Sequence, residues 1–297
     1  MKYVITGGAG HISKPLAEKL LAAAHEVTVI GRNAGNLKEL VAKGAKAAVG
    51  SVEDIPFLSQ AFKNADAVYT MVPPNFPTID WKGWIGQIGA NYAKAIEANN
   101  IKYVVNLSSI GAHLADGVGP VSGLYRAEQA LNKLNNTNIR HLRPSYFFNN
   151  LLANTALVKN AGIIGSNFGG ENFKLVLADP ADIADAAFEE LSKLDFIGHS
   201  HRYIASDERN TEEIAQVIGG AVGKSGLPWV VFSDSDAFNA MVQAGLPEEV
   251  AKNYAEMGNA LHSGKMAEDY WKNHPGRLGK VKLEDFAKTF AAVYNAN

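Results

Sequence analysis

The chain of 297 residues contains no cysteine, which excludes disulfides, thiol nucleophiles and thiolate metal sites. No uninterrupted apolar run reaches the length of a membrane-spanning helix. The 28 basic and 30 acidic residues nearly balance, so the composition does not favour nucleic acid or an anionic membrane as a partner. The first apolar run begins within a few residues of Met1 and leaves no room for a signal peptide, so we expect a cytoplasmic protein.

A glycine-rich turn stands at the start of the chain, between an apolar run and a helical pattern. Tyr3–Ile5 leads into Thr6-Gly7-Gly8-Ala9-Gly10-His11-Ile12-Ser13, after which leucines recur at helical spacing and a second apolar run follows at 27–30. This is a βαβ pattern with glycines spaced as in a dinucleotide fingerprint, whether the first glycine is Gly7 or Gly8. Glycines permit close approach to a pyrophosphate, and the free N–H groups of the next helix attract it. We therefore predict cofactor contacts from Thr6, Gly7, Gly10, His11 and Ile12.

The end of the second strand indicates which dinucleotide binds. An acidic residue there would bind the adenosine ribose and repel a 2′-phosphate. The segment Ile30-Gly31-Arg32-Asn33 contains no acid, and a guanidinium can pair with a phosphate. We predict NADP rather than NAD; the alternative is that Arg32 simply faces solvent. Sheet topology also places Ser51 near the adenine, and Val72 and Pro73 near the nicotinamide.

Strands and helices alternate as far as Pro144, which predicts an α/β fold with a doubly wound parallel Rossmann sheet. We expect a Rossmann domain over residues 1–150, with later returns near 173–206. Residues 151–297 are expected to form a smaller, interwoven α/β domain that binds substrate or a partner. Within it, 147–160 is predicted to be helical and the glycine-rich stretch 162–172 a loop.

The chain resembles the short-chain dehydrogenase/reductase superfamily, and most closely its atypical NmrA-like branch. The resemblance implies a Rossmann domain, a small C-terminal domain and a cleft between them. Members include NAD(P)H-dependent reductases of quinones and dyes, and dinucleotide-binding redox regulators that act without demonstrated turnover. The stretches that carry the resemblance are Ile5–Ile12, His25–Asn33, Val72–Pro74, Tyr125–Glu128, Leu142–Asn150 and Asp179–Ala184.

The resemblance also shows what this chain lacks. Typical members of the superfamily pair a tyrosine with a lysine four residues later, and the tyrosine protonates the carbonyl being reduced. Here Tyr125 is followed by Gln129, and in the other register Ser122 is followed by Arg126. Arg126 can still bind ribose hydroxyls but cannot release a proton near neutral pH. The alternative for Arg126 is an exposed helix arginine.

The missing pair disfavours ketone–alcohol chemistry and favours hydride transfer to a small conjugated acceptor, such as a quinone or a dye. The product's charge is delocalised there, and water can supply the proton. Such a site needs bound NADPH and an apolar slot, which aromatic side chains could line: Phe76, Trp81, Trp84, Tyr146 and Phe147. Phe76 and Trp81, which polar residues flank, are expected to face ligand, whereas Tyr146 and Phe147 suit the slot and the core equally well.

Three residues are candidate catalytic groups. Ser108 ends the fifth strand, where the superfamily places a catalytic serine; Tyr125 and Tyr146 carry phenols that could reach the cleft. We predict no metal site, since His199 and His201 lack a third ligand nearby in the sequence. The leading interpretation is an NADP-dependent oxidoreductase with a small-molecule substrate; the alternative is a non-catalytic NADP(H)-binding redox sensor that acts through a protein partner.

Overall fold

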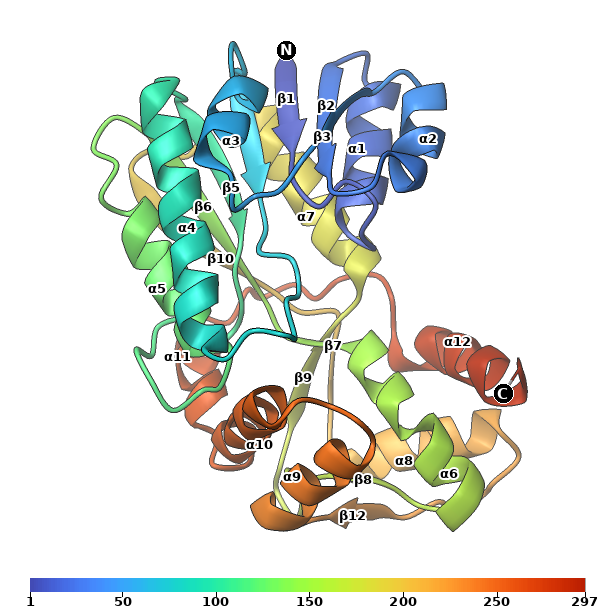
Figure 1. Ribbon diagram of the computed structural model, residues 1–297. Helices are drawn as coiled ribbons and strands as arrows, with labels where there is room; N and C mark the ends of the chain where they lie inside the picture. Colours follow the sequence, from blue (N-terminus) through green and yellow to red (C-terminus); the bar gives the residue numbers. More distant parts are fainter. Residues whose placement is uncertain (297) are drawn as a thin grey trace.

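Seven parallel strands carry the glycine-rich turn and the other loops of interest at their carboxyl ends (Figure 1). The computed structural model describes residues 1–296. The strands lie in the order β10-β6-β5-β4-β1-β2-β3, as the alternating pattern predicts for a doubly wound sheet. They are β1 (Lys2–Ile5), β2 (Glu26–Gly31), β3 (Lys46–Val49), β4 (Ala67–Thr70), β5 (Tyr103–Leu107), β6 (Asn138–Pro144) and β10 (His199–Ile204).

Helices cover both faces of this sheet. One face packs against α1, α2 and α7, and the other against α3, α4 and α5, and a separate buried apolar cluster fills each interface. Strand β10 and helix α7 come late in the chain yet complete this sheet and its cover. The bounds are α1 (Ser13–Ala22), α2 (Ala34–Ala42), α3 (Ile55–Ala61), α4 (Trp81–Ala98), α5 (Val121–Leu131) and α7 (Pro180–Lys193).

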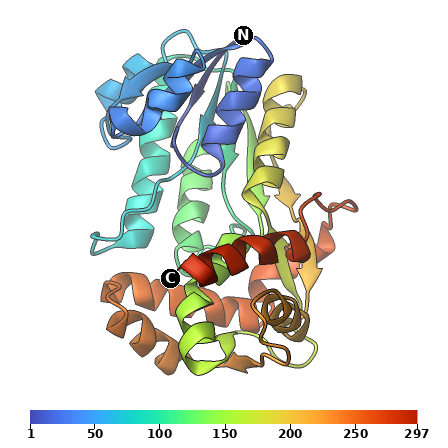
Figure 2. The same cartoon turned by 90° about the vertical axis from the view of Figure 1, so that its right-hand side faces the viewer.

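The remaining elements form a second, smaller part with its own core. A three-stranded sheet, β11-β9-β7, and a two-stranded sheet, β12-β8, pack among its helices. Figure 2 shows the C-terminal helix α12 at the boundary between the two parts. The elements are β7 (Tyr146–Phe147), η1 (Phe148–Asn154), α6 (Thr155–Ala161), β8 (Ile164–Ser166), β9 (Leu175–Ala178), β11 (Asp207–Arg209), α8 (Thr211–Ala221), β12 (Trp229–Val231), α9 (Asp234–Gln243), α10 (Glu248–His262), η2 (Lys265–Ala267), α11 (Glu268–Lys272) and α12 (Leu283–Ala296).

The structure corrects one local prediction for this part and confirms another. The stretch 162–172 is not loop throughout, because β8 pairs with β12 within it. The stretch predicted to be helical is confirmed from Phe148 onward, as the 3₁₀ helix η1 followed by α6, whereas Phe147 belongs to β7. Short strands containing glycine have almost no periodic signal, which is why the sequence pattern missed β8.

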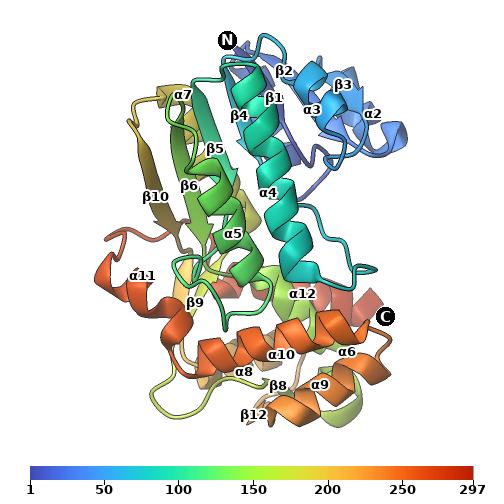
Figure 3. The same cartoon turned by 60° about the vertical axis from the view of Figure 1, so that its left-hand side comes forward.

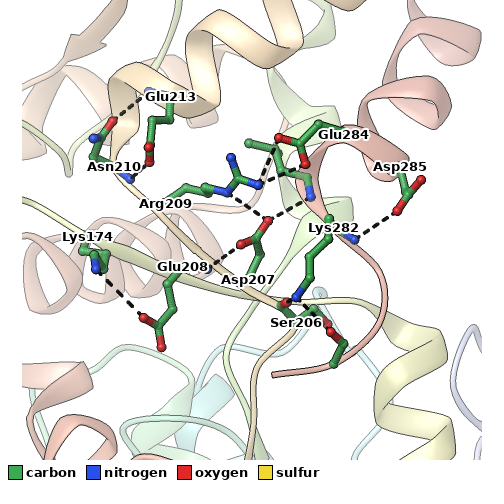
Figure 4. A network of polar contacts seen from close by, with 12 residues as sticks. Lys174, Ser206, Asp207, Glu208, Arg209, Asn210, Glu213, Lys282, Glu284 and Asp285 are labelled. Carbon is green, nitrogen blue, oxygen red and sulfur yellow. Dashed lines mark hydrogen bonds and ion pairs between the residues drawn. The ribbon is translucent and has the colours of Figure 1, made fainter. Parts of the chain in front are cut away.

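A group of hydrogen bonds joins the segment before α12 to the start of α7. The carboxylate of Asp182 accepts hydrogen bonds from the Ser206 hydroxyl at 2.6 Å and from the backbone N–H groups of Lys280 and Val281. Nearby, the Lys282 ammonium donates to the carbonyl of Ser206, and Asp207 accepts from the guanidinium of Arg209 (Figure 4). The stretch 179–184 thus has a structural role, which is to join the two parts of the molecule.

Within residues 1–296, no helix combines the length and the apolar character that crossing a membrane requires.

Candidate functional site

The glycine-rich turn lies at the switch point of the sheet. Strand β1 has β2 on one side and β4 on the other, and ligands of such sheets bind where the strand order reverses. The Thr6 hydroxyl, just after β1, accepts the N–H of Met71, just after β4, at 2.8 Å. The Tyr92 hydroxyl of α4 donates to the Met71 carbonyl at 2.7 Å. Thr6 is wholly buried, so its side chain fixes the ends of the two strands.

The turn itself is closed by backbone hydrogen bonds. Gly7 has a φ of +68°, in the left-handed region that favours glycine. The N–H of Gly10 donates to the Gly7 carbonyl at 2.8 Å, and the N–H of Gly8 donates to the Ile30 carbonyl at 2.9 Å. The turn is therefore tied to the ends of β1 and β2, as the fingerprint predicts.

The helix that follows the turn begins without a cap. Helices α2, α3 and α4 are capped by the side chains of Asn33, Asp54 and Asp80, whereas α1 has no side-chain cap and no acidic residue in its first turn. Within residues 1–296, the N–H groups of His11, Ile12 and Ser13 have no protein acceptor. Free N–H groups at the positive end of a helix dipole suit a pyrophosphate.

Arg32 lies at the end of β2 with its side chain exposed. In the described chain it has no ion-pair or hydrogen-bond partner, so it is available to a phosphate. The neighbouring Asn33 is engaged as the cap of α2. The N–H of Gly50, just after β3, donates to the Gly31 carbonyl at 3.1 Å. Ser51 follows Gly50, and the Ser51 hydroxyl accepts a hydrogen bond from the N–H of Glu53 at 3.2 Å. Arg32 and Ser51 thus lie on neighbouring strand ends.

The segment after β4 packs against α10 of the smaller part. Figure 3 shows α10 lying across the lower ends of α4 and α5. Trp81 is only 5% exposed, and its ring contacts Tyr254 of α10 edge-on, with centroids 5.4 Å apart. Half-buried Val72 packs on the same apolar cluster, which Trp81, Ile85 and Val250 form. Our expectation that Trp81 is open to ligand was wrong, because α10 covers it.

The other predicted slot aromatics differ in their surroundings. Phe76 is 40% exposed and contacts Trp81 edge-on. Trp84 is half-buried, and its indole N–H is enclosed without a partner. Phe147 packs on the cluster formed by the sheet with α1 and α7, whereas Tyr146 packs on the core of the smaller part.

Helix α5 carries both registers of the missing pair, and neither forms a catalytic dyad. Ser122 is fully buried and its hydroxyl has no partner, while Arg126 is exposed and forms a 3.4 Å ion pair with Asp116. In the other register, Gln129 is exposed and Tyr125 is half-buried. Within residues 1–296 the Tyr125 hydroxyl has no hydrogen-bond partner.

Ser108 belongs to a buried ion-pair network. Its hydroxyl donates to the Glu128 carboxylate at 2.6 Å, and the Arg143 guanidinium binds the same carboxylate through two hydrogen bonds of 3.0 and 2.6 Å. Burial alone would raise the pKa of Glu128, but the hydrogen bonds from Arg143 and Ser108 outweigh it and lower the pKa. Arg143 also contacts the hydroxyl of Tyr203 at 3.4 Å, and that hydroxyl donates to Asp269 of α11 at 2.5 Å. This geometry gives Ser108 a structural partner, which sequence reasoning missed.

Tyr146 lies at the junction of the two parts of the molecule. Burial raises the pKa of its phenol, and the nearby Tyr254 raises it further. The phenol therefore keeps its proton and can donate a hydrogen bond. Tyr146 also lines a pocket of about 590 Å³, together with Ile110, Phe173 and Trp271. Another pocket, of about 430 Å³, lies at the amino ends of β1, β2 and β3 and is lined by Lys2, Glu26 and Lys46, far along the strands from the glycine turn.

The structure gives no metal centre among the residues it describes, since no group of three histidine or acidic side chains there could hold an ion.

Comparison with known proteins also indicates a dinucleotide-binding fold. The model of the NAD(P)H-binding family matches residues 7–159, which include the glycine turn, Arg32 and Tyr146. The chain belongs to the NAD(P)H-binding family. The expected likeness to NmrA is confirmed at the level of the fold.

Three relatives show the range of this similarity. The NAD(P)H azoreductase of Xenophilus azovorans is 23% identical over 295 residues, which cover 99% of each chain. The NADPH-dependent quinone oxidoreductase of Escherichia coli, solved with NADPH, has a TM-score of 0.81 at 19% identity, covering 97% of this chain and 99% of that one. NmrA, a negative transcriptional regulator, has a TM-score of 0.78 at 14% identity, covering 99% of this chain and 97% of that one. The two structural matches therefore establish the fold.

Proposed function

We propose that this protein is an NADPH-dependent reductase that acts on a small conjugated acceptor of the quinone or dye type. The observation that carries the proposal is the uncapped start of α1 behind the glycine turn, with exposed Arg32 beside it. NADPH, when bound, supplies the hydride from its nicotinamide ring. The azoreductase that is similar in sequence and the quinone oxidoreductase that is similar in fold are named for azo compounds and quinones, both of which are conjugated acceptors.

The residues present fit the dinucleotide. The backbone of the turn from Gly7 to Ile12 would hold the pyrophosphate: the hydrogen bond from Gly10 to Gly7 fixes the turn, and the N–H groups of His11 and Ile12 have no protein acceptor within residues 1–296. Arg32 would pair with the 2′-phosphate, which favours NADP over NAD.

Four further residues would complete the cofactor site. Ser51 would lie at the adenine, and Val72 and Pro73 beside the nicotinamide. Arg126 would contact the ribose only after leaving Asp116, a weak exposed pair at 3.4 Å.

The proton that completes reduction would come from a phenol or from water. Tyr146 is our first choice as donor because it lines a pocket of about 590 Å³, and Tyr125 is the second because its hydroxyl has no hydrogen-bond partner within residues 1–296. Ser108 is the third choice, since its hydroxyl already donates to Glu128.

The test is a titration of the purified chain with NADPH, followed by oxidation of NADPH in the presence of a panel of quinones and dyes. We expect binding and an acceptor-dependent loss of NADPH absorbance. Tight binding without turnover on any acceptor would support the alternative, a redox sensor acting through a protein partner; NmrA, which has a similar fold, is a negative transcriptional regulator.

A further inference from the structure

The pocket of about 590 Å³ belongs mainly to the smaller part of the molecule. Its lining comes from two sets of segments: β7, β9 and the stretch before β9, and then the end of α10, η2 and α11. Ile110, in the loop after β5, lines it as well. Among residues 1–296, none of those predicted to hold the cofactor lines this pocket. The pocket is therefore a cavity that the dinucleotide motif does not explain.

Two of the aromatic side chains that line the pocket rest on a third ring in the core. Phe168 contacts Tyr146 edge-on, with centroids 5.5 Å apart, and stacks on Phe173 at 5.7 Å. Phe168 is itself buried in the core of the smaller part. The rings of Tyr146 and Phe173 are thus held in place from the core side, and aromatic walls of this kind are typical of ligand pockets.

A third aromatic side chain of the lining, Trp271 of α11, is held in place although 41% of it is exposed. Its ring contacts Tyr270 edge-on at 5.0 Å and stacks with His274 at 6.2 Å. The ammonium of Lys174 lies 5.9 Å from the centroid of the same ring. A ring that is already fixed loses little conformational entropy when a ligand covers it, so Trp271 suits a flat ligand.

The polar residues of the pocket carry charges of both signs. Lys174 and Glu171 line it, and both are exposed, as is His262. Within residues 1–296, Glu171 has no ion pair, and Lys174 approaches Glu208 only to 4.0 Å. One ammonium and one carboxylate give the pocket no preference for an anion or a cation. A neutral ligand can enter without leaving either charge buried and unpaired.

The size of the pocket indicates how many rings it can hold. An apolar cavity of about 150 Å³ is large enough for one benzene ring. A pocket of about 590 Å³ therefore has room for two or three rings, fused or linked.

We propose that this pocket binds a neutral, flat ligand of two or three aromatic rings, which contacts Phe173 and Trp271. In the proposed reductase this ligand is the acceptor, because Tyr146, the first choice as proton donor, lines the same pocket. That identification rests on the proposed function. The binding itself needs no turnover and would serve a redox sensor equally.

The experiment titrates a neutral naphthoquinone, with two rings, and a neutral benzoquinone, with one, into the purified chain without reduced cofactor. Calorimetry should show tighter binding of the naphthoquinone. Phe173→Ala and Trp271→Ala should each weaken its binding about fivefold, the usual effect of losing one aromatic contact with its buried area. Phe57→Ala is the matched control and should leave the affinity unchanged, because Phe57 is also half-buried but lines the other pocket, of about 430 Å³.

Trp271→Phe reports where the quinone binds. The variant keeps an aromatic wall, so the affinity for the naphthoquinone should stay within about twofold of the wild type. Quenching of tryptophan emission by the bound quinone should fall, because the indole that lines the pocket is gone. Two of the remaining tryptophans, Trp81 and Trp84, pack beside α4, and the third, Trp229, lies against Phe168.

Four results would overturn the inference. Unchanged affinity in both Phe173→Ala and Trp271→Ala would exclude this pocket, and a loss in Phe57→Ala would place the ligand in the other one. Equal affinity for the two quinones would contradict the number of rings, and undiminished quenching in Trp271→Phe would place the quinone elsewhere. A chain that binds the naphthoquinone as expected but never reduces it would refute the reductase proposal and support the binding site.

Discussion

A methyl group on Gly7 would lie 2.6 Å from the Sδ atom of Met71, across the switch point of the sheet. The φ of Gly7, +68°, adds backbone strain for any residue with a Cβ atom. Met71 is in turn fixed at both ends of its backbone, by Thr6 and by Tyr92. The shape of the phosphate turn therefore depends on glycine at this position.

The first prediction is that Gly7→Ala weakens NADPH binding. The added methyl group must move Met71 or the turn, which displaces the N–H groups that would face the pyrophosphate, so we expect a loss in affinity of about tenfold or more. Calorimetric titration with NADPH measures it. Gly198→Ala is the control. Gly198 has nearly the same φ, +67°, but open space around it, so the variant adds backbone strain without a steric clash. It lies just before β10, an edge strand of the sheet, far from the glycine turn. If both variants bind NADPH like the wild type, the turn is not the phosphate site.

The second prediction concerns the choice of dinucleotide. Arg32→Ala should weaken NADPH binding about tenfold, the usual effect of losing one charge-assisted contact, and leave NADH binding unchanged. Parallel titrations with the two cofactors measure the ratio. Lys63→Ala, another exposed cation but outside the site, should change neither. Equal losses for NADPH and NADH would place Arg32 away from the 2′-phosphate.

The cofactor half of the site could be predicted because its signals are local. The strand, the glycine turn and the helix are consecutive in the sequence, so spacing alone located Gly7 and Arg32 on the carboxyl ends of neighbouring strands. The alternation of strands and helices predicted a doubly wound parallel sheet for the same reason, and the structure has one of seven strands.

The acceptor half could not be predicted, because it depends on contacts between distant segments. Trp81 is flanked by Asp80 and Lys82 and looked exposed, yet α10 from the far end of the chain covers it. Tyr254 lies on an ordinary amphipathic helix, and nothing near it in the sequence indicates its contact with Trp81. Glu128 likewise looks like a surface residue of α5 until β6 brings Arg143 against it.

The third prediction tests this buried ion pair. Glu128→Gln leaves the guanidinium of Arg143, a residue only 7% exposed, with no ion pair but the longer one to Asp269 at 3.8 Å, which should lower the free energy of unfolding by about 3 kcal/mol. Chemical denaturation measures the change. Asp285→Asn, which breaks the exposed pair with Lys288, should cause no measurable loss. A similar, small effect of both variants would contradict a structural role for the Glu128–Arg143 pair.

The fourth prediction follows from His141, which is buried between two asparagine side chains. Its Nδ1 and Nε2 lie 3.0 Å from the amides of Asn106 and Asn132, and burial lowers its pKa to about 4 from an ordinary value of 6.5. The unfolded chain therefore binds a proton that the folded chain does not, between those two values. The stabilisation is complete above pH 6.5 and is lost as the pH falls toward 4, by about 3 kcal/mol. Denaturation from pH 7 to 4.5 should show a shallower pH dependence for His141→Gln than for the wild type; parallel curves would contradict the assignment.

The most direct test of the reductase is an anaerobic reaction of the protein with NADPH and a neutral quinone, followed through the absorbance of both. We predict that NADPH and quinone disappear in equal amounts, at a rate proportional to protein concentration, and that Gly7→Ala slows the reaction. Binding of NADPH with no acceleration of its oxidation by any quinone or dye would contradict the account.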